Sequence, residues 1–235
     1  MSLKIGWCNT AEDARIAFDP PVRFIPSKDK SGKSQGFLSC PAVRSYFDGI
    51  YFVGSPFSIQ LRYVMEDGFN SIKPVYPFTS ISEAKFRELV TIEPHETWTN
   101  SHTVALQIPS PYLFFSDVPA TIEQFHPSLV QTSSMNWRVI PGKFDIYSWQ
   151  RPLNWAIEWD TKLGDLVIRS GEPLYFIKFC GVNDSYGSVE LVECDITQEI
   201  KDRLLLSRGI TGIRKGLVPL MAKAGISRSN TKLIL

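Results

Sequence analysis

The chain has 235 residues, which is enough for one large domain or two small domains with a well-buried core. Its 43% hydrophobic and 21% charged residues are typical of a globular protein and exclude the disordered and fibrous classes. The formal net charge of +1 conceals an uneven distribution, because the chain from Arg203 onward holds seven Lys or Arg and no Asp or Glu. Residues 1–202 hold the other 18 Lys or Arg and all 24 Asp or Glu, so they carry about −6.

The N-terminal segment, residues 1–36, is expected to be irregular. Prolines frame a short extended piece at 22–25, and a polar, lysine-rich stretch follows at 27–36. The first residues lack the apolar run of a secretory signal. No apolar run reaches the roughly 18 residues that span a bilayer, so no transmembrane segment is expected.

Cysteine usage points to a reducing compartment. The four cysteines are widely spaced and form no Cys-x-x-Cys pair: Cys8, Cys40, Cys180 and Cys194. Without an export signal, this pattern predicts four reduced and mostly buried thiols in a cytoplasmic protein.

Residues 37–194 read mainly as β-strands. In 57–64 the apolar side chains of Phe57, Ile59, Leu61 and Tyr63 alternate with polar ones, the period of a strand with one buried face. A helix is predicted over 83–90, with Ser80 and Glu83 at capping-box spacing. Further strands are predicted at 49–53, 103–108, 112–115, 120–125, 165–168, 173–180 and 188–194.

Four of the six tryptophans fall in one stretch with strand periodicity, at Trp137, Trp149, Trp155 and Trp159. Alternation places Trp155, Ile157 and Trp159 on the same face, and we interpret that face as core between two sheets. Trp149 precedes a polar turn and is predicted to be exposed. As an alternative to core packing, the tryptophans could form a platform that stacks on sugars or bases, in the manner of a carbohydrate-binding module.

The pattern changes to helix near residue 195. Ile196, Ile200 and Leu204 recur every four residues, and Asp195 lies three residues before Gln198, as in a capping box. The predicted organisation is an irregular segment (1–36), a β-domain (37–194) and a helical, basic C-terminal extension (195–235). The predicted fold class is mainly β, an antiparallel β-sandwich of jelly-roll type or a related barrel.

The basic C-terminal extension is the strongest functional signal. It predicts a non-enzymatic interaction or structural protein that needs no cofactor and contacts a protein partner, a second copy of itself or nucleic acid. The alternative is that these cations form the solvated face of helices packed on an acidic body. The candidate contact residues are Arg203, Arg208, Arg214, Lys215, Lys223, Arg228 and Lys232, together with Trp149.

A second hypothesis is a metal-dependent enzyme of the cupin or oxygenase type. His95, His102 and His126, with Glu93 or Glu96, would bind a divalent metal such as iron. Against it, no His has a His or carboxylate two positions later, and side chains at adjacent positions such as His95 and Glu96 point to opposite faces of a strand.

Overall fold

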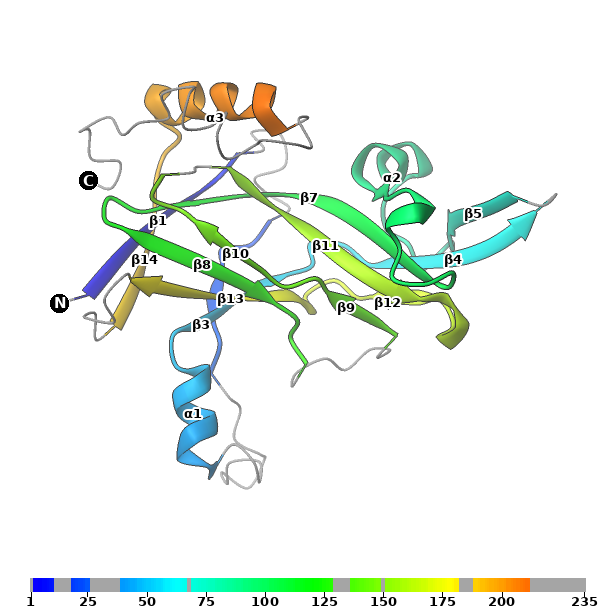
Figure 1. Cartoon of the computed structure of the whole chain (residues 1–235), viewed down its shortest axis with the longest axis horizontal. Coiled ribbons are helices and arrows are strands. Elements are labelled where there is room, and N and C mark those ends of the chain that lie inside the picture. Colours follow the sequence, from blue (N-terminus) through cyan, green and yellow to red (C-terminus); the bar gives the residue numbers. More distant parts are fainter. Residues whose placement is uncertain are drawn as a thin grey trace.

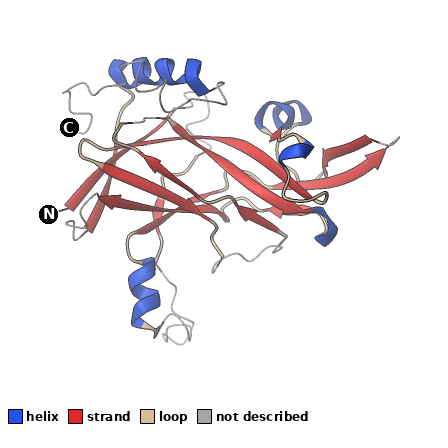
Figure 2. Cartoon of the chain, viewed as in Figure 1, coloured by secondary structure: helices blue, strands red, loops and turns tan. Residues whose placement is uncertain are grey.

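A computed structural model of the chain describes residues 2–10, 18–25, 39–66, 69–128, 136–148, 151–181 and 188–211. For 66, 69, 70 and 206–211 it describes the backbone only. The described chain is mainly β, which confirms the predicted class, and Figure 2 shows its curved strands with helices at the margins. None of the helices in this part of the chain combines the length and the apolar character needed to cross a bilayer.

Strands from both ends of the chain meet in the first sheet. Its order is β14 (Ser188–Glu193), β1 (Ser2–Asn9), β7 (Thr103–Phe115), β11 (Pro152–Asp160) and β9 (Trp137–Val139), and β6 (Thr91–Ile92) also pairs with β7. The long β7 pairs with β11 along most of its length and with β1 near its end.

Two smaller sheets complete the β-structure. The second sheet has the order β10 (Gly142–Asp145), β8 (Ala120–Phe125), β13 (Pro173–Gly181), β3 (Ile50–Gly54) and β2 (Val22–Arg23). The third has the order β12 (Leu166–Ile168), β4 (Ile59–Glu66) and β5 (Phe69–Pro74). The outer parts of β4 and β5 extend beyond the rest of the molecule (Figure 1).

Side chains from all three sheets meet in one hydrophobic core. Trp155, Ile157 and Trp159 of β11 are almost fully buried there, so their predicted place in the core is confirmed. They meet Val53 of β3 and Ile122 of β8 from the second sheet in the same cluster. Burying such large side chains stabilises the fold by about 1.5–3 kcal/mol each.

Helices cover the outer faces of the two larger sheets. Helix α3 (Gln198–Thr211) buries Ile200 against the first sheet, and α1 (Pro41–Phe47) buries Phe47 against Ile50 and Phe176 of the second. The two helices lie on opposite sides of the molecule in Figure 1. Two short 3-10 turns, His95–Thr97 and Thr161–Leu163, flank the ends of the long strands.

The N-terminal prediction was wrong for residues 2–9, which form β1 rather than irregular chain. Leu3, Ile5 and Trp7 point into the core, while the outer face of β1 is covered from Gly6 onward. Leu3, Ile5 and Trp7 alternate with small or polar residues, so this segment does carry the period-two signal of a strand. The signal is short, because both faces of the strand are buried from Gly6 onward. The extended piece expected at 22–25 is confirmed in part, as β2.

Strand direction and strand continuity also differ from the prediction. β1 and β14 pair in parallel, so the first sheet is not purely antiparallel. Such a pair needs no tight turn, because its strands lie at opposite ends of the chain. The two strands expected at 103–108 and 112–115 are one continuous β7, which runs through Pro109 and Pro111.

Helix α2 (Glu83–Leu89) confirms the predicted helix but has a different cap. The hydroxyl of Ser82, not Ser80, accepts the hydrogen bond from the Lys85 N–H at 3.2 Å. Ser80 instead accepts from the Ser58 N–H at 3.0 Å, which joins the approach of this helix to that of β4. A local spacing rule cannot separate two serines that lie two residues apart.

Candidate functional site

The three histidines have separate local partners. His95 packs on Trp98 with 4.7 Å between ring centroids, and the Nδ1 of His126 accepts a hydrogen bond from the Val139 N–H at 3.2 Å. The main chain of His102 binds Asn100 and Thr161. Within the described ranges, which include all three histidines, no three His, Cys, Asp or Glu side chains could hold a metal ion together.

The two glutamates of the metal hypothesis do not assemble a site either. Glu93 accepts a hydrogen bond from Gln107 at 2.8 Å, and Glu96 is an exposed residue of the 3-10 turn at His95–Thr97. The geometry thus gives the metal-enzyme hypothesis no support.

Only the beginning of the basic segment lies in the described chain. Arg203 donates a hydrogen bond to Glu199 one turn earlier at 2.5 Å, and only 15% of its side chain is exposed. Arg203 therefore contributes to α3 itself rather than to an open basic surface. Arg208 lies in α3, where only its backbone is described. The remaining candidates lie outside the described residues: Arg214, Lys215, Lys223, Arg228, Lys232 and Trp149.

Helix α3 fixes the place from which the basic segment starts. Ile200 is fully buried in a cluster with Cys8, Leu113 and Phe115 of the first sheet, and Ile196 and Leu204 pack at its edge. The hydroxyl of Thr197 accepts the Ile200 N–H at 3.3 Å, the contact of an N-terminal cap. Helix α3, which ends at Thr211, is therefore anchored on the first sheet by apolar contacts.

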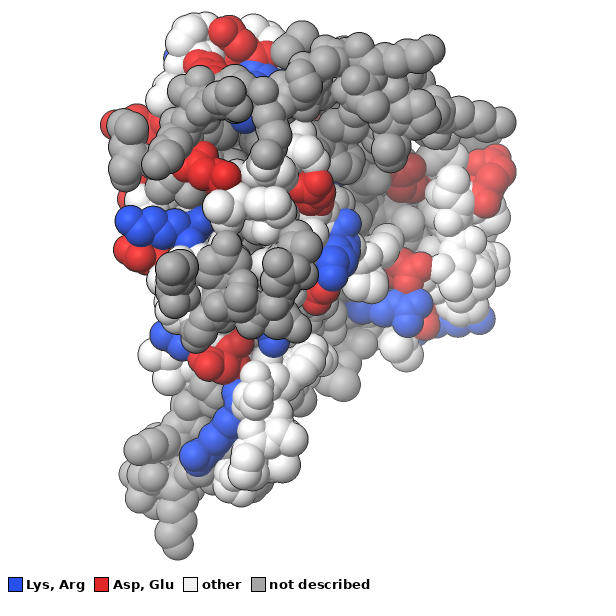
Figure 3. All heavy atoms as spheres, turned by 60° about the vertical axis from the view of Figure 1, so that its left-hand side comes forward, with Lys and Arg blue, Asp and Glu red and all other residues white. Residues whose placement is uncertain are grey.

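Acidic and basic side chains are mixed on the face of the body in Figure 3. Several acidic groups there and elsewhere are held in ion pairs, such as Glu158 with Arg138 at 2.5 Å and Glu123 with Lys143 at 2.9 Å. Burial tends to raise the pKa of Glu158, but hydrogen bonds from Thr99 and Arg138 outweigh burial and lower this pKa. On this face, acidic side chains therefore lie among basic ones and do not form a single acidic patch.

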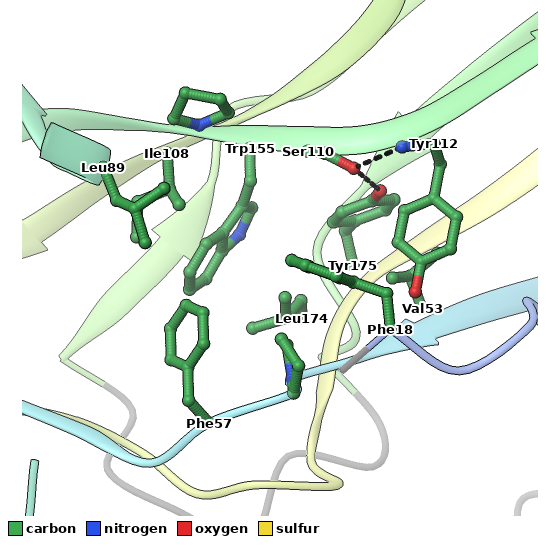
Figure 4. Close-up of a pocket in the computed structure, with 12 residues that line it drawn as sticks. Phe18, Val53, Phe57, Leu89, Ile108, Ser110, Tyr112, Trp155, Leu174 and Tyr175 are labelled. Carbon is green, nitrogen blue, oxygen red and sulfur yellow. Dashed lines mark hydrogen bonds between the residues drawn. The ribbon is translucent and has the colours of Figure 1, made fainter. Parts of the chain in front are cut away.

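An aromatic pocket lies between the first and second sheets, next to α2 (Figure 4). Its walls include Phe57, Trp155, Leu174 and Tyr175, and Leu89 of α2 lies at one side. The pocket has a cavity volume of about 30 Å³, enough for ordered water but far below the roughly 300–1,000 Å³ of ligand pockets. It is therefore a gap in the core rather than a substrate site.

The polar groups at this pocket are few and neutral. Ser110 and Tyr175 share a hydrogen bond of 3.1 Å between their hydroxyl oxygens, and the Trp155 indole N–H has no hydrogen-bond partner among the described residues. Burial raises the pKa of the Tyr175 phenol, and the same cause raises the pKa of the Tyr112 phenol nearby. Both phenols remain protonated near neutral pH, so neither acts as a base there.

A larger, polar groove lies where the ends of the first and second sheets meet. It has about 250 Å³ of accessible space, and its lining includes Arg23, Asp48, Lys178 and Ser188. Arg23 pairs with Asp48 at 2.7 Å, and the Lys178 ammonium donates to the Tyr46 carbonyl at 3.3 Å. The two cations are thus held by local partners, and the groove carries both signs of charge.

No protein-family model matches the sequence, and no curated protein matches it.

Proposed function

We propose that the chain is a non-enzymatic interaction or structural protein of the cytoplasm. Its β-body is a sandwich of jelly-roll type that serves as a scaffold, and the helical extension at 195–235 contacts a partner chain. The observation that carries the proposal is the charge segregation, about −6 over residues 1–202 against seven cations and no anion from Arg203 onward.

The anchored α3 supports this role. Because Ile200 holds the helix on the first sheet, the cations beyond residue 211 start from a fixed position on the body. A contact made there would be transmitted to a rigid scaffold. Arg203 is excluded from the contact set in this proposal, since Glu199 already binds it. The proposed contact residues are Arg208, Arg214, Lys215, Lys223, Arg228 and Lys232, with Trp149 as an aromatic contact.

A protein face fits this segment better than a phosphate backbone does. Between its cations the segment holds many apolar residues, among them Ile213, Leu217, Leu220 and Met221, which would bury against an apolar surface. Nucleic-acid binding relies mainly on charge and would leave these side chains in water. A second copy of this chain offers an acidic body of suitable charge, so self-association is the first contact to test.

The test removes residues 212–235 and keeps α3 intact. Sedimentation velocity at about 50 mM and about 500 mM salt should show the full chain associating at low salt and the shortened chain remaining monomeric, because salt screens exposed charges. A full-length variant with Gln at Arg214, Lys215, Lys223, Arg228 and Lys232 should behave like the shortened chain. Circular dichroism should be that of a folded β-protein in each case.

A matched control removes the same charge elsewhere. Its five substitutions to Gln lie at exposed positions of the body, at Lys73, Lys85, Arg87, Lys143 and Lys162. They make the body more acidic and therefore should not weaken association. Titration with a duplex DNA of about 20 base pairs distinguishes the other partner class. Binding to the duplex without self-association would move the contact to nucleic acid. The proposal is overturned if the full chain neither self-associates nor binds the duplex.

A further inference from the structure

Two cysteines from opposite ends of the chain lie beside each other. Trp7 of β1 is in register with Glu193 of β14, and the Cys194 N–H donates to the Trp7 carbonyl at 2.9 Å. The next position in this parallel register pairs Cys8 with Cys194. The two residues also belong to the same apolar cluster on the outer face of the first sheet.

We propose that Cys8 and Cys194 form a disulfide when the protein meets a small disulfide oxidant, and that this bond fastens β14 to β1. The inference is independent of the function proposed above. None of the four cysteines is disulfide-bonded in the structure, so the site is described in its reduced state.

The spacing suits such a bond. Neighbouring strands lie about 4.8 Å apart, and the Cα atoms of a disulfide lie roughly 4.4–6.8 Å apart. Cys8 and Val192 share the outer apolar cluster, and Cys194 follows Val192 by two residues, so strand alternation puts both thiols on that face. Cys194 lies just past the end of β14, and Cys8 is one residue before the end of β1. Strand ends allow the small approach of the Cβ atoms that the bond requires.

The two thiols differ in access. Cys8 is buried, whereas Cys194 is half-buried and is the sulfur that an oxidant reaches first. The Cys194 thiolate attacks one sulfur of the oxidant RSSR. This step forms a mixed disulfide between Cys194 and one RS group and releases the other as RS⁻. The Cys8 thiolate then attacks the Cys194 sulfur and releases the second RS⁻. The two thiol protons pass to the two leaving thiolates, so RSSR is reduced to two RSH while the protein is oxidised.

The surroundings of Cys194 set the rate of this reaction. Burial raises the pKa of its thiol, and the carboxylates of Asp117, Asp195 and Glu193 raise it further. Because the thiolate is the nucleophile, the exchange should be slow near neutral pH and should accelerate as the pH rises toward this pKa. A site of this kind responds to sustained oxidation rather than to a brief pulse.

The consequence falls on β14, an edge strand. In the described part of the chain β14 pairs only with β1, and α3 begins five residues after it ends. A covalent link at Cys194 would therefore hold the edge of the first sheet and the approach to α3 in place. Amide hydrogens of residues 188–193 should exchange more slowly in the oxidised protein than in the reduced protein.

The test uses a chain that keeps only this pair. The variant Cys40→Ser/Cys180→Ser is incubated with glutathione at increasing ratios of oxidised to reduced form, and then digested and analysed by mass spectrometry. The expected product is one peptide pair joined between Cys8 and Cys194, with both free thiols lost. In concentrated urea, the same degree of protein oxidation should need a ratio of oxidised to reduced glutathione on the order of 100-fold higher, because only the folded chain holds the two thiols together.

The controls separate the proposed pair from chance oxidation. Cys194→Ser should form no internal bond, and Cys8→Ser should stop at the mixed disulfide on Cys194. The complementary variant Cys8→Ser/Cys194→Ser keeps Cys40 and Cys180 and should form no internal bond while folded. The proposal would be overturned if the folded variant Cys40→Ser/Cys180→Ser gave no Cys8–Cys194 peptide pair at any ratio of oxidised to reduced glutathione. Equal yields in the folded and urea-treated chain, or unchanged amide exchange over 188–193, would also count against it.

Discussion

The carboxylate of Asp165 accepts hydrogen bonds from two nitrogens of the Arg62 guanidinium, from Nη2 at 2.7 Å and from Nε at 3.1 Å. Gln60 donates to the same carboxylate at 2.7 Å. These contacts join β4 to the residue that precedes β12. Hydrogen bonding by Arg62 is the main cause that holds the pKa of Asp165 below its ordinary value, while partial burial opposes it and Gln60 adds to it.

The lowered pKa of Asp165 predicts a loss of stability in acid. A carboxyl whose pKa is lower in the folded chain stabilises the fold above its unfolded pKa, about 3.9 for Asp, and this contribution disappears as the pH falls through the folded pKa. Asp165→Asn should therefore lower the midpoint of urea unfolding at pH 6. The difference from the wild type should shrink as the pH falls below about 4.

Asp48→Asn is the matched control for this substitution. Asp48 also pairs with an arginine, Arg23, but 71% of its side chain is exposed, and exposed ion pairs contribute little to stability. Its urea midpoint at pH 6 should stay close to that of the wild type. A difference between Asp165→Asn and wild type that persists unchanged in acid would show that packing, not charge, is responsible.

Trp155 and Trp159 provide a comparison of two buried indoles on one strand. Both are almost fully buried, but Trp159 Nε1 donates to the Gly164 carbonyl at 2.9 Å, whereas Trp155 Nε1 has no partner among the described residues. Both changes to Phe shorten a core side chain. Trp159→Phe should cost about 0.5–1.5 kcal/mol more than Trp155→Phe in the free energy of unfolding, because it also removes a hydrogen bond.

Chemical denaturation of the two variants and the wild type checks this prediction. Trp159→Phe should also speed amide exchange in the turn at Thr161–Leu163, since the lost contact holds the Gly164 end of this turn. Equal destabilisation by both substitutions would mean that the hydrogen bond contributes nothing beyond packing.

The sequence predicts those strands whose signal is local. β8 occupies the predicted range Ala120–Phe125, and β11 buries every second residue, because its other face remains partly open. Alternation of this kind is contained in a few consecutive residues and depends little on distant contacts. The helix at Glu83–Leu89 was predictable for the same reason, although its capping serine was not.

The sequence does not show features that depend on distant partners. β1 alternates in only a few residues before both of its faces become buried, and its place between β14 and β7 depends on partners far away in the chain. Helix α1 buries only Phe47, too few apolar positions to reveal a periodic face. For the same reason the juxtaposition of Cys8 with Cys194 was invisible, since it results from a parallel pairing of the two ends of the chain. The positive charge of the C-terminal segment, by contrast, follows from a count of its residues and is therefore visible in the sequence.

The absence of a side chain at Gly6 lets β1 pack closely on Phe115 of β7. A Cβ atom at Gly6 would collide with the ring of Phe115, its cross-strand partner, and Phe115 is fully buried and cannot move aside. Gly6→Ala should lower the free energy of unfolding by about 1–3 kcal/mol. In a double-mutant cycle, Phe115→Leu should relieve part of this cost, so that the double variant is more stable than the sum of the single effects.

Gly142→Ala is the control for this collision. A Cβ atom at Gly142 also meets an aromatic ring, that of Phe144, but this ring is half-buried on the edge strand β10 and can rotate away. Its cost in chemical denaturation should be smaller than that of Gly6→Ala. If the two alanine variants lose equal stability, general strand propensity rather than the contact with Phe115 explains both.

Ile200 tests whether a single side chain anchors α3. Replacing Ile200 with Ala removes the fully buried side chain that packs on Cys8, Leu113 and Phe115, a loss of about 2–4 kcal/mol at a core position. Because α3 lies at the margin, the loss should appear as local opening: amides of α3 should exchange on the order of 30-fold faster or more, while those of β11 stay unchanged.

Leu205→Ala is the matched control, since Leu205 lies on the same helix but is 61% exposed, and it should leave exchange in α3 nearly unaltered. Equal acceleration by both variants would show that α3 is held through another face, and the start of the basic segment would then not be fixed by the first sheet.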